Sequence, residues 1–374
     1  MTSLQDAGLP VEPARPTTAV VVAGTHVRLT RLQHLLATVG ILVVAAARSV
    51  DEGVDAVCEH EPDTVLLDLA MDAGGLELVE RVMGRCATPI VLTGPAAESA
   101  AVAMAAGAVD LVTPGTEGLG PVVYARALAR HLAVASRVRV ITHPRGRLRE
   151  RGLATGSAPT SPSLLTHRGG RAQRPSVVVI GASTGGPPAL AAVLGALPSD
   201  LGVPVVVVQH MAEGFVEGLA SWLDGIVDAS VTVALNGDRL RPGHVVLAPS
   251  DGNLVVESGL RLRVEDPRPD QFHVPEIDRT MRSVADVSRE HAVGVLLTGM
   301  GRDGAEGMAA IAAAGGVTIA QDETSSVVYG MPREAVALGA AQHVLPLEQI
   351  APALIALMNN HNGVNATPRW KESI

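Results

Sequence analysis

Aromatic side chains are scarce in this sequence. The 374 residues include two Trp, two Tyr and two Phe, so any hydrophobic core must be aliphatic. This scarcity disfavours nucleic-acid-binding modules that stack bases on aromatic rings. Positive charge is also in deficit, because 29 Lys and Arg face 38 Asp and Glu, a formal net charge of −9. That balance disfavours non-specific binding to DNA or anionic membranes, and we expect no nucleic-acid partner.

Cysteines and long apolar runs are rare as well. The two cysteines, Cys58 and Cys86, form no metal-ligand spacing and lie in periodic apolar segments, so we expect buried free thiols. No apolar run approaches about 20 residues, which predicts no membrane span. Residues 1–16 lack the basic start and apolar core of a signal peptide. We therefore expect a cytoplasmic protein.

Apolar residues are abundant enough for more than one core. Hydrophobic residues make up 47% of the chain and charged residues 18%, and the length suits two domains. After a polar, proline-rich lead at 1–16, expected to be disordered, short apolar strands alternate with amphipathic helices. We predict strands at 17–22, 41–47, 64–69, 89–94 and 109–114, and helices at 27–39, 49–61 with Ser49 as its N-cap, 75–85, 98–107 and 118–136.

This alternation predicts the class of the first domain. Short, wholly apolar strands are typical of a parallel sheet covered by helices on both faces. We therefore predict a doubly wound, flavodoxin-like α/β domain at 17–136. Residues 137–175 are rich in Arg, Gly, Ser, Thr and Pro, which indicates a linker. The alternative is a basic segment that binds an acidic partner.

A second parallel-sheet α/β domain is predicted at 176–359, followed by a tail at 360–374 that we expect to be disordered. Its predicted strands are 176–180, 204–209, 230–235, 292–298 and 316–321, and its helices 187–197, 214–224, 276–290, 303–314 and 347–359. Residues 244–266 alternate apolar and polar side chains around Asp251-Gly252 and Ser258-Gly259. That pattern predicts antiparallel β-hairpins inserted into the domain.

A glycine-rich turn, Gly-Ala-Ser-Thr-Gly-Gly at 181–186, follows the first strand of this second domain. Ligands bind at the carboxyl ends of strands in such sheets. A dinucleotide fingerprint does not fit, because Ser183 replaces its second glycine, and no P-loop G-K-[S/T] is present. The pattern G-x-S-x-G, which presents a serine nucleophile on a strand-to-helix corner, does fit. The alternative is a turn whose serine only caps the following helix.

A serine nucleophile needs a base and a group that orients the base. His210 ends the predicted strand 204–209, and Asp303 follows the strand 292–298 in a second glycine-rich turn. Three strand ends of one predicted sheet thus carry Ser, His and Asp, in an order that differs from that of the α/β-hydrolases. The alternatives are an ordinary core or surface histidine and an aspartate that caps a helix.

Six segments resemble successive motifs of CheB, the protein-glutamate methylesterase family of bacterial chemotaxis. They are IGASTGGPPAL, VVVVQHMAEGF, NGDRLRPGHVVLAPSDGNL, LLTGMGRDGAEGM, AAAGGVTIAQDETSSVVYGMPREAV and VLPLEQIA. In order they span about residues 176–358. The family consists of a receiver domain, a linker and a methylesterase domain, and the alternation at 17–136 matches that arrangement.

The resemblance implies an activity and a set of site residues. The family hydrolyses methyl esters of glutamate side chains on chemoreceptors with release of methanol, and many members also deamidate receptor glutamines. Ser183 matches the nucleophile, His210 the base and Asp303 the orienting acid. The backbone N–H groups of Thr184 and Met300 match the oxyanion donors. A methylated chemoreceptor-type protein is the implied substrate, and no cofactor or catalytic metal is implied.

Two stretches depart from the family pattern. Residues 275–278 read Pro-Glu-Ile-Asp where the family usually has Pro-Ser-Val-Asp, and they border the cleft in the family, which leaves substrate choice open. In the receiver, Ala23 and Gly24 stand where metal-binding acids are usual, and Thr113 stands where a lysine is usual. Asp68 still matches the phosphoacceptor.

A degenerate receiver is therefore expected. Asp68 would be a vestigial phosphoacceptor beside the switch hydroxyl of Thr93, and control would pass to a regulatory protein that docks on the receiver, or the enzyme would be constitutively active. The alternative is that Asp72 or Asp110 supplies the metal site from a new position. Two rival functions remain for the whole chain: a catalytically silent signalling scaffold that works by protein contacts, and a nucleotide-dependent enzyme.

Overall fold

The computed structural model describes most of the chain in two α/β parts. The described residues are 15–71, 74–94, 100, 102–104, 106–112, 120–137, 175–198, 200–211, 214–268, 271 and 273–359. The predicted lead up to residue 14, nearly all of the predicted linker and the tail from residue 360 lie outside these residues. Asp72, Thr113 and four residues of the predicted helix at 98–107 lie outside them too.

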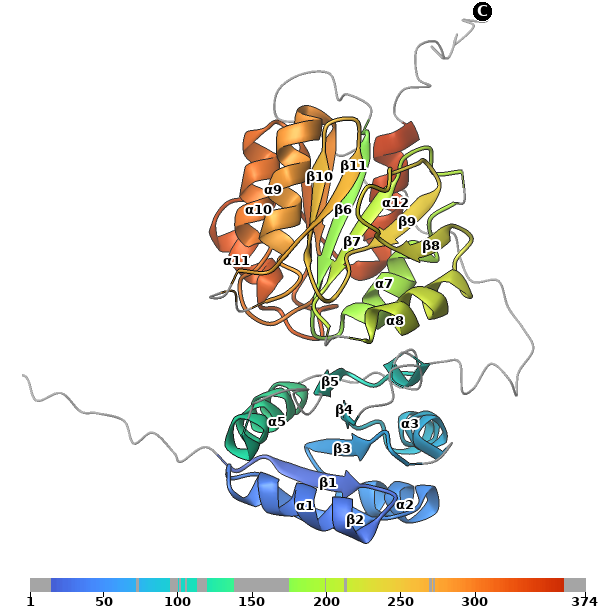
Figure 1. Cartoon of the computed structure of the whole chain (residues 1–374). Helices are drawn as coiled ribbons and strands as arrows, with labels where there is room; N and C mark the ends of the chain where they lie inside the picture. The colour runs from blue at the N-terminus through green and yellow to red at the C-terminus, as the bar shows by residue number, and fades with distance from the viewer. Residues whose placement is uncertain are drawn as a thin grey trace, which may run out of the picture.

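The N-terminal part is a five-stranded parallel sheet with strand order β2-β1-β3-β4-β5 (Figure 1). This is the flavodoxin-like order, as predicted. Helices α2 and α3 pack their apolar side chains on one face, and α1 and α5 pack theirs on the other. The elements are β1 (Thr18–Val22), α1 (His26–Ala37), β2 (Leu42–Ala47), α2 (Val50–His60), β3 (Thr64–Asp68), α3 (Gly74–Arg85), β4 (Ile90–Thr93), β5 (Asp110–Val112) and α5 (Pro121–Ala135).

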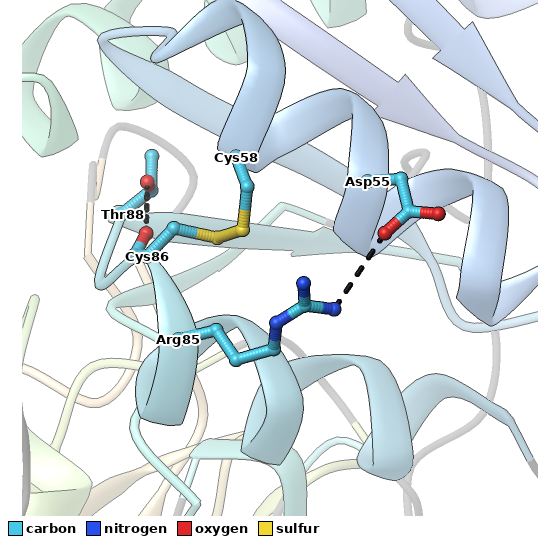
Figure 2. Close-up of a disulfide and its surroundings, with 5 residues drawn as sticks. All are labelled: Asp55, Cys58, Arg85, Cys86 and Thr88. Atoms are coloured by element: carbon cyan, nitrogen blue, oxygen red, sulfur yellow. Dashed lines mark hydrogen bonds and ion pairs between the residues drawn. A yellow bond between two sulfur atoms is a disulfide. The ribbon is translucent and has the colours of Figure 1, made fainter.

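Local sequence signals explain where α2 begins, but the disulfide near its end was not predicted. Ser49 caps α2, and its hydroxyl accepts a hydrogen bond from the Glu52 backbone N–H. Near its end, Cys58 forms a disulfide with Cys86, with their Cα atoms 5.4 Å apart (Figure 2). The expectation of free thiols was therefore wrong. The sequence pattern placed each cysteine in its own segment, whereas the packing of α2 beside α3 on one sheet face brings the two together.

The C-terminal part is a seven-stranded, wholly parallel sheet with the order β14-β13-β12-β6-β7-β9-β8. Helices α7, α8 and α12 cover one face, and α9, α10 and α11 cover the other together with the hairpin β10–β11. The strands are β6 (Val177–Ala182), β7 (Val205–Gln209), β8 (Ser230–Val233), β9 (His244–Leu247), β10 (Asn253–Glu257), β11 (Arg261–Glu265), β12 (Ala292–Leu296), β13 (Val317–Gln321) and β14 (His343–Leu345). The helices are α7 (Gly186–Leu194), α8 (Val216–Asp224), α9 (Ile277–Ser288), the 3-10 turn η1 (Arg289–His291), α10 (Ala305–Ala313), α11 (Met331–Ala337) and α12 (Leu347–Asn359).

The hairpin prediction for 244–266 was correct only in part. β10 and β11 pair antiparallel, but β9 runs parallel to β7 and β8 inside the main sheet. The prediction also missed β14 and α11, which are the shortest strand and helix of this part. Among the described helices, none has the length and hydropathy needed to cross a bilayer.

Candidate active site

The strand order creates a switch point at the centre of the larger sheet. β6 lies between β12 and β7, so the chain leaves the carboxyl ends of three adjacent strands at one edge. Ser183 follows β6, His210 follows β7, and Asp303 lies in the loop between β12 and α10. Ligands bind at such switch points in open α/β sheets. The three residues predicted from the sequence are therefore at adjoining strand ends.

The turn that carries Ser183 depends on glycines. The Ser183 backbone N–H donates to the Thr298 carbonyl over 3.1 Å, which ties the turn to the loop after β12. Gly185 has a φ of +74°, and a Cβ there would lie 2.4 Å from the Val327 Cβ. A Cβ on Gly299 would lie 2.7 Å from the Ser183 Cβ. A side chain at either glycine would displace the corner that presents the serine.

His210 and Asp303 form a direct pair. His210 Nε2 lies 2.7 Å from Asp303 Oδ2, and their side chains are 10% and 8% exposed. The Asp303 carboxylate also accepts the backbone N–H groups of Ile277, Asp278 and Gly304 over 2.8 to 2.9 Å. Asp303 therefore does not cap its own helix, whose N-cap is Gly304 without a side-chain bond. It anchors the N-terminus of α9 instead.

These hydrogen bonds determine the charge of Asp303 and the tautomer of His210. Burial alone would raise the pKa of Asp303, but the hydrogen bonds from His210 and from the α9 backbone outweigh it and hold the pKa below its ordinary value. An ionised carboxylate can only accept, so the hydrogen atom of the pair lies on His210 Nε2. His210 Nδ1 then carries the lone pair that a general base needs.

The Ser183 hydroxyl and the predicted oxyanion donors make no hydrogen bond to the His210–Asp303 pair among the described residues. Within the described residues, no hydrogen bond links the Ser183 hydroxyl to His210. The backbone N–H groups of Thr184 and Met300 likewise donate to no acceptor in the described part of the chain, and Thr184 is buried. Two backbone donors without a protein acceptor near Ser183 could bind a developing oxyanion.

Two buried polar residues that the sequence reasoning missed connect the loops of the site. The Gln209 side-chain amide donates to the carbonyls of Ser183 and His210 over 2.8 and 2.9 Å. The Thr298 hydroxyl donates to the Thr184 carbonyl over 3.0 Å. Gln209 ends the apolar strand β7 and Thr298 lies two residues beyond the apolar strand β12, and that position was the available signal.

One oxygen from each of the carboxylates of Glu276, Asp278 and Asp303 lies within 4.8 Å of the others, close enough for all three to contact one cation. Asp303 already accepts four hydrogen bonds from protein donors, and Asp278 accepts one from the Gly307 backbone over 2.6 Å. Burial raises the pKa of Asp278 to about 6, which is the opposite of what a bound cation needs. These residues therefore suit a hydrogen-bonded cluster better than a metal site.

In the N-terminal part, Asp68 ends β3 and its side chain is fully buried. Arg28 of α1 contacts both of its carboxylate oxygens through Nε and an Nη atom. The Thr93 hydroxyl donates to the Val112 carbonyl over 2.8 Å and also contacts the Tyr124 hydroxyl. The predicted vestigial phosphoacceptor is thus paired with an arginine.

Asp110 lies elsewhere, against the second part of the chain. Its Oδ2 atom accepts hydrogen bonds from His131 Nδ1 over 2.7 Å and from the Thr184 hydroxyl over 3.0 Å. The Gly185 backbone N–H donates to the Val109 carbonyl over 3.2 Å. Strand β5 therefore contacts the turn that carries Ser183. With this carboxylate bound to His131 and Thr184, the structure does not support Asp110 as part of a relocated metal site.

Comparison with known proteins gives two family matches. Residues 178–354 match the family described as CheB methylesterase. Residues 20–114 match the family described as response regulator receiver domain. The fold, the site and these matches define the class: a response regulator whose receiver domain precedes an enzymatic domain.

Individual relatives agree over most of the chain. Protein-glutamate methylesterase/protein-glutamine glutaminase 2 of Anaeromyxobacter dehalogenans is 44% identical over 320 residues, which cover 84% of this chain and 89% of that protein. The Nitrosospira multiformis protein-glutamate methylesterase/protein-glutamine glutaminase is 38% identical over 326 residues, which cover 85% of this chain and 90% of that protein. Among solved structures, the Thermotoga maritima CheB methylesterase catalytic domain is 36% identical with a TM-score of 0.48, covering 50% of this chain and all of that one. The chain belongs to the CheB family of protein-glutamate methylesterases, and it is an enzyme of that class.

Proposed function

We propose that this enzyme hydrolyses methyl esters of glutamate side chains in chemoreceptor-type proteins through an acyl-enzyme on Ser183. The observation that carries the proposal is the 2.7 Å contact between His210 Nε2 and Asp303 Oδ2 at strand ends that adjoin the Ser183 turn. The names of the relatives, protein-glutamate methylesterase/protein-glutamine glutaminase, support the substrate class.

The first half of the reaction forms the acyl-enzyme. The Ser183 hydroxyl oxygen attacks the ester carbonyl carbon while its proton passes to His210 Nδ1. The oxyanion that develops receives hydrogen bonds from the backbone N–H groups of Thr184 and Met300, each worth roughly 3 kcal/mol in comparable sites. His210 then protonates the methoxy oxygen, and methanol leaves. The Ser183–His210 hydrogen bond needed for this step is expected to form when substrate binds.

The second half regenerates the serine. Water attacks the acyl carbonyl and gives a proton to His210, the serine oxygen takes that proton back, and a free glutamate carboxylate is released. A glutamine side chain would follow the same route with ammonia in place of methanol, and the names of the relatives favour this second activity. Asp303 stays ionised throughout and stabilises the His210 imidazolium.

We also propose a regulatory protein partner for the receiver domain. The contact between Asp110 and Thr184 supports this idea, because it places a receiver strand directly on the turn next to Ser183. A partner that docks on the receiver would change access to that turn. We place the reaction in the cytoplasm, which cell fractionation would test.

The activity is tested by methanol release from methylated receptors. Ser183→Ala and His210→Ala should each remove nearly all turnover, and the double variant should lose little more, because members of such a group act as a unit. Ser230→Ala, on an exposed position of β8, is the matched control. A folded Ser183→Ala protein with wild-type turnover would exclude the serine mechanism. A wild-type protein that a fluorophosphonate labels at Ser183 but that releases no methanol would exclude the substrate class instead.

A further inference from the structure

A second histidine lies against the proposed base. The ring of His273 stacks on the ring of His210, with centroids 4.6 Å apart and planes 9° from parallel. That separation is typical of offset stacking between aromatic rings. His273 comes from the loop between β11 and α9, so it reaches the site from a different element than Ser183, His210 or Asp303. None of the sequence motifs had assigned it a role.

The loop that carries His273 is anchored to the hairpin. Gln271 donates through Nε2 to the His273 carbonyl. Gln271 and Asn253 exchange two side-chain hydrogen bonds of 2.8 Å each. The buried Asn253 also accepts the Glu276 backbone N–H over 2.9 Å. The backbone of His273 is therefore anchored by a chain of hydrogen bonds that begins on β10.

One hydrogen bond does not fix an imidazole ring. Asp303 holds His210 at Nε2 only, and rotation about the Cβ–Cγ bond of His210 would break that bond and turn Nδ1 away from its working direction. A flat ring packed over one face restricts this rotation. Resting on the proposed function, we infer that His273 is a positioning residue that keeps the imidazole of His210 in the plane required for proton transfer with Ser183.

The charge state of His273 fits this role. Burial and then the neighbouring His210 lower the pKa of His273; Asp303 opposes them more weakly, and Arg130 adds the smallest lowering effect. A neutral ring at neutral pH does not oppose the positive charge that His210 acquires during attack. His273 is nevertheless an exposed residue, so it can also meet an incoming substrate.

The test compares His273→Phe, which keeps a flat ring, with His273→Ala, which removes it. For a glutamate methyl ester peptide, His273→Ala should lower kcat on the order of 10- to 100-fold with KM changed less than about 3-fold, since a small misplacement of a reacting group has that cost. His273→Phe should retain at least about a third of wild-type kcat. His60→Ala, at the end of α2, is the control histidine. Gln271→Leu removes the hydrogen bonds that anchor the His273 backbone but keeps the His273 side chain. It should lower kcat by an amount between those of the Phe and Ala variants.

A second readout separates this inference from the proposed activity. ¹⁵N NMR of the imidazole nitrogens requires no turnover, and in the wild type it should show His210 in the Nε2–H form. His273→Ala should broaden or mix that signal, and His273→Phe should not. A folded His273→Ala protein with kcat within about 2-fold of wild type and an unchanged His210 signal would overturn the inference. Equal losses in the Phe and Ala variants would also overturn it, because the imidazole chemistry and not the stack would then matter. If the wild type itself does not turn over the ester, the proposed function fails while the NMR comparison still decides the positioning role.

Discussion

Arg28 binds both carboxylate oxygens of Asp68, the residue that matches the phosphoacceptor of receiver domains. The Asp68 side chain is fully buried, and that of Arg28 is 42% exposed. The hydrogen bond to Asp68 raises the pKa of Arg28, so the guanidinium stays charged. An arginine thus supplies the positive charge at the carboxylate in a chain that has Ala23 and Gly24 where metal-binding acids are usual.

This ion pair predicts poor phosphorylation of Asp68. Phosphoryl transfer to a carboxylate needs a cation that bridges it to the incoming group, and Arg28 occupies the oxygens that would attack. Acetyl phosphate with Mg²⁺ should therefore leave Asp68 unmodified on a gel that retards phosphoproteins. Arg28→Ala alone should not restore the reaction, because the two acids remain absent. Stoichiometric, Mg²⁺-dependent phosphorylation with activation would mean that the switch has been rearranged and not lost.

The esterase activity should depend more on the charge of Asp303 than on the shape of its side chain. In Asp303→Asn, an amide NH2 group at the position of Oδ2 would donate to His210 Nε2 and not accept from it, so the wrong tautomer is favoured. We expect kcat to fall on the order of 10³- to 10⁴-fold, as when the orienting carboxylate of a comparable triad is neutralised. Esterase assays on both Asp303→Asn and Asp303→Ala check this. Near-normal activity with Asn would reduce Asp303 to an anchor for α9.

Asp278 should make the protein more stable as the pH falls toward 4. Burial raises its pKa from 3.8 to about 6 in the folded state, so folding takes up a proton between these values and stability is lost as the pH rises through that window. Asp278→Asn, which keeps an acceptor for the Gly307 backbone, should stabilise the fold at pH 7 by about 1 to 2 kcal/mol and flatten the pH dependence. Urea unfolding at several pH values measures both effects. Asp286→Asn, exposed on the same helix, should do neither.

The Cys58–Cys86 disulfide should stabilise the receiver domain. Its sequence separation of 28 residues corresponds to about 3 to 4 kcal/mol in the loop-entropy description. Before reduction, thiol titration of the unfolded chain should find no free cysteine, and Cys58→Ser should lower the unfolding free energy by up to that amount. The surface pair of Arg85 and Asp55 at 3.6 Å (Figure 2) provides the control, since Asp55→Asn should cost less than about 1 kcal/mol. Two free thiols in the native protein would contradict the prediction.

Much of the fold was determined locally. Short runs such as the Val-rich stretch of β7 and the Ser49 cap of α2 predict their elements because apolar periodicity and capping act over a few residues. The glycine turn at Ser183 and the strand-end positions of His210 and Asp303 could be predicted for the same reason. In a parallel sheet, residues that follow strands all lie at one edge, so chain position alone indicated that they share that edge.

Other relationships depend on which elements become neighbours in space, and a single sequence does not encode those pairs in its local pattern. The strand order that puts β6 between β12 and β7 determines that Ser183, His210 and Asp303 adjoin. Packing of α2 beside α3 joins Cys58 to Cys86 in a disulfide, whereas the apolar periodicity of each segment had predicted two free thiols. Tertiary structure alone placed Arg28 on Asp68 and the His273 ring on His210, because each contact joins elements that are far apart in the chain and whose side chains meet only after the sheets are covered.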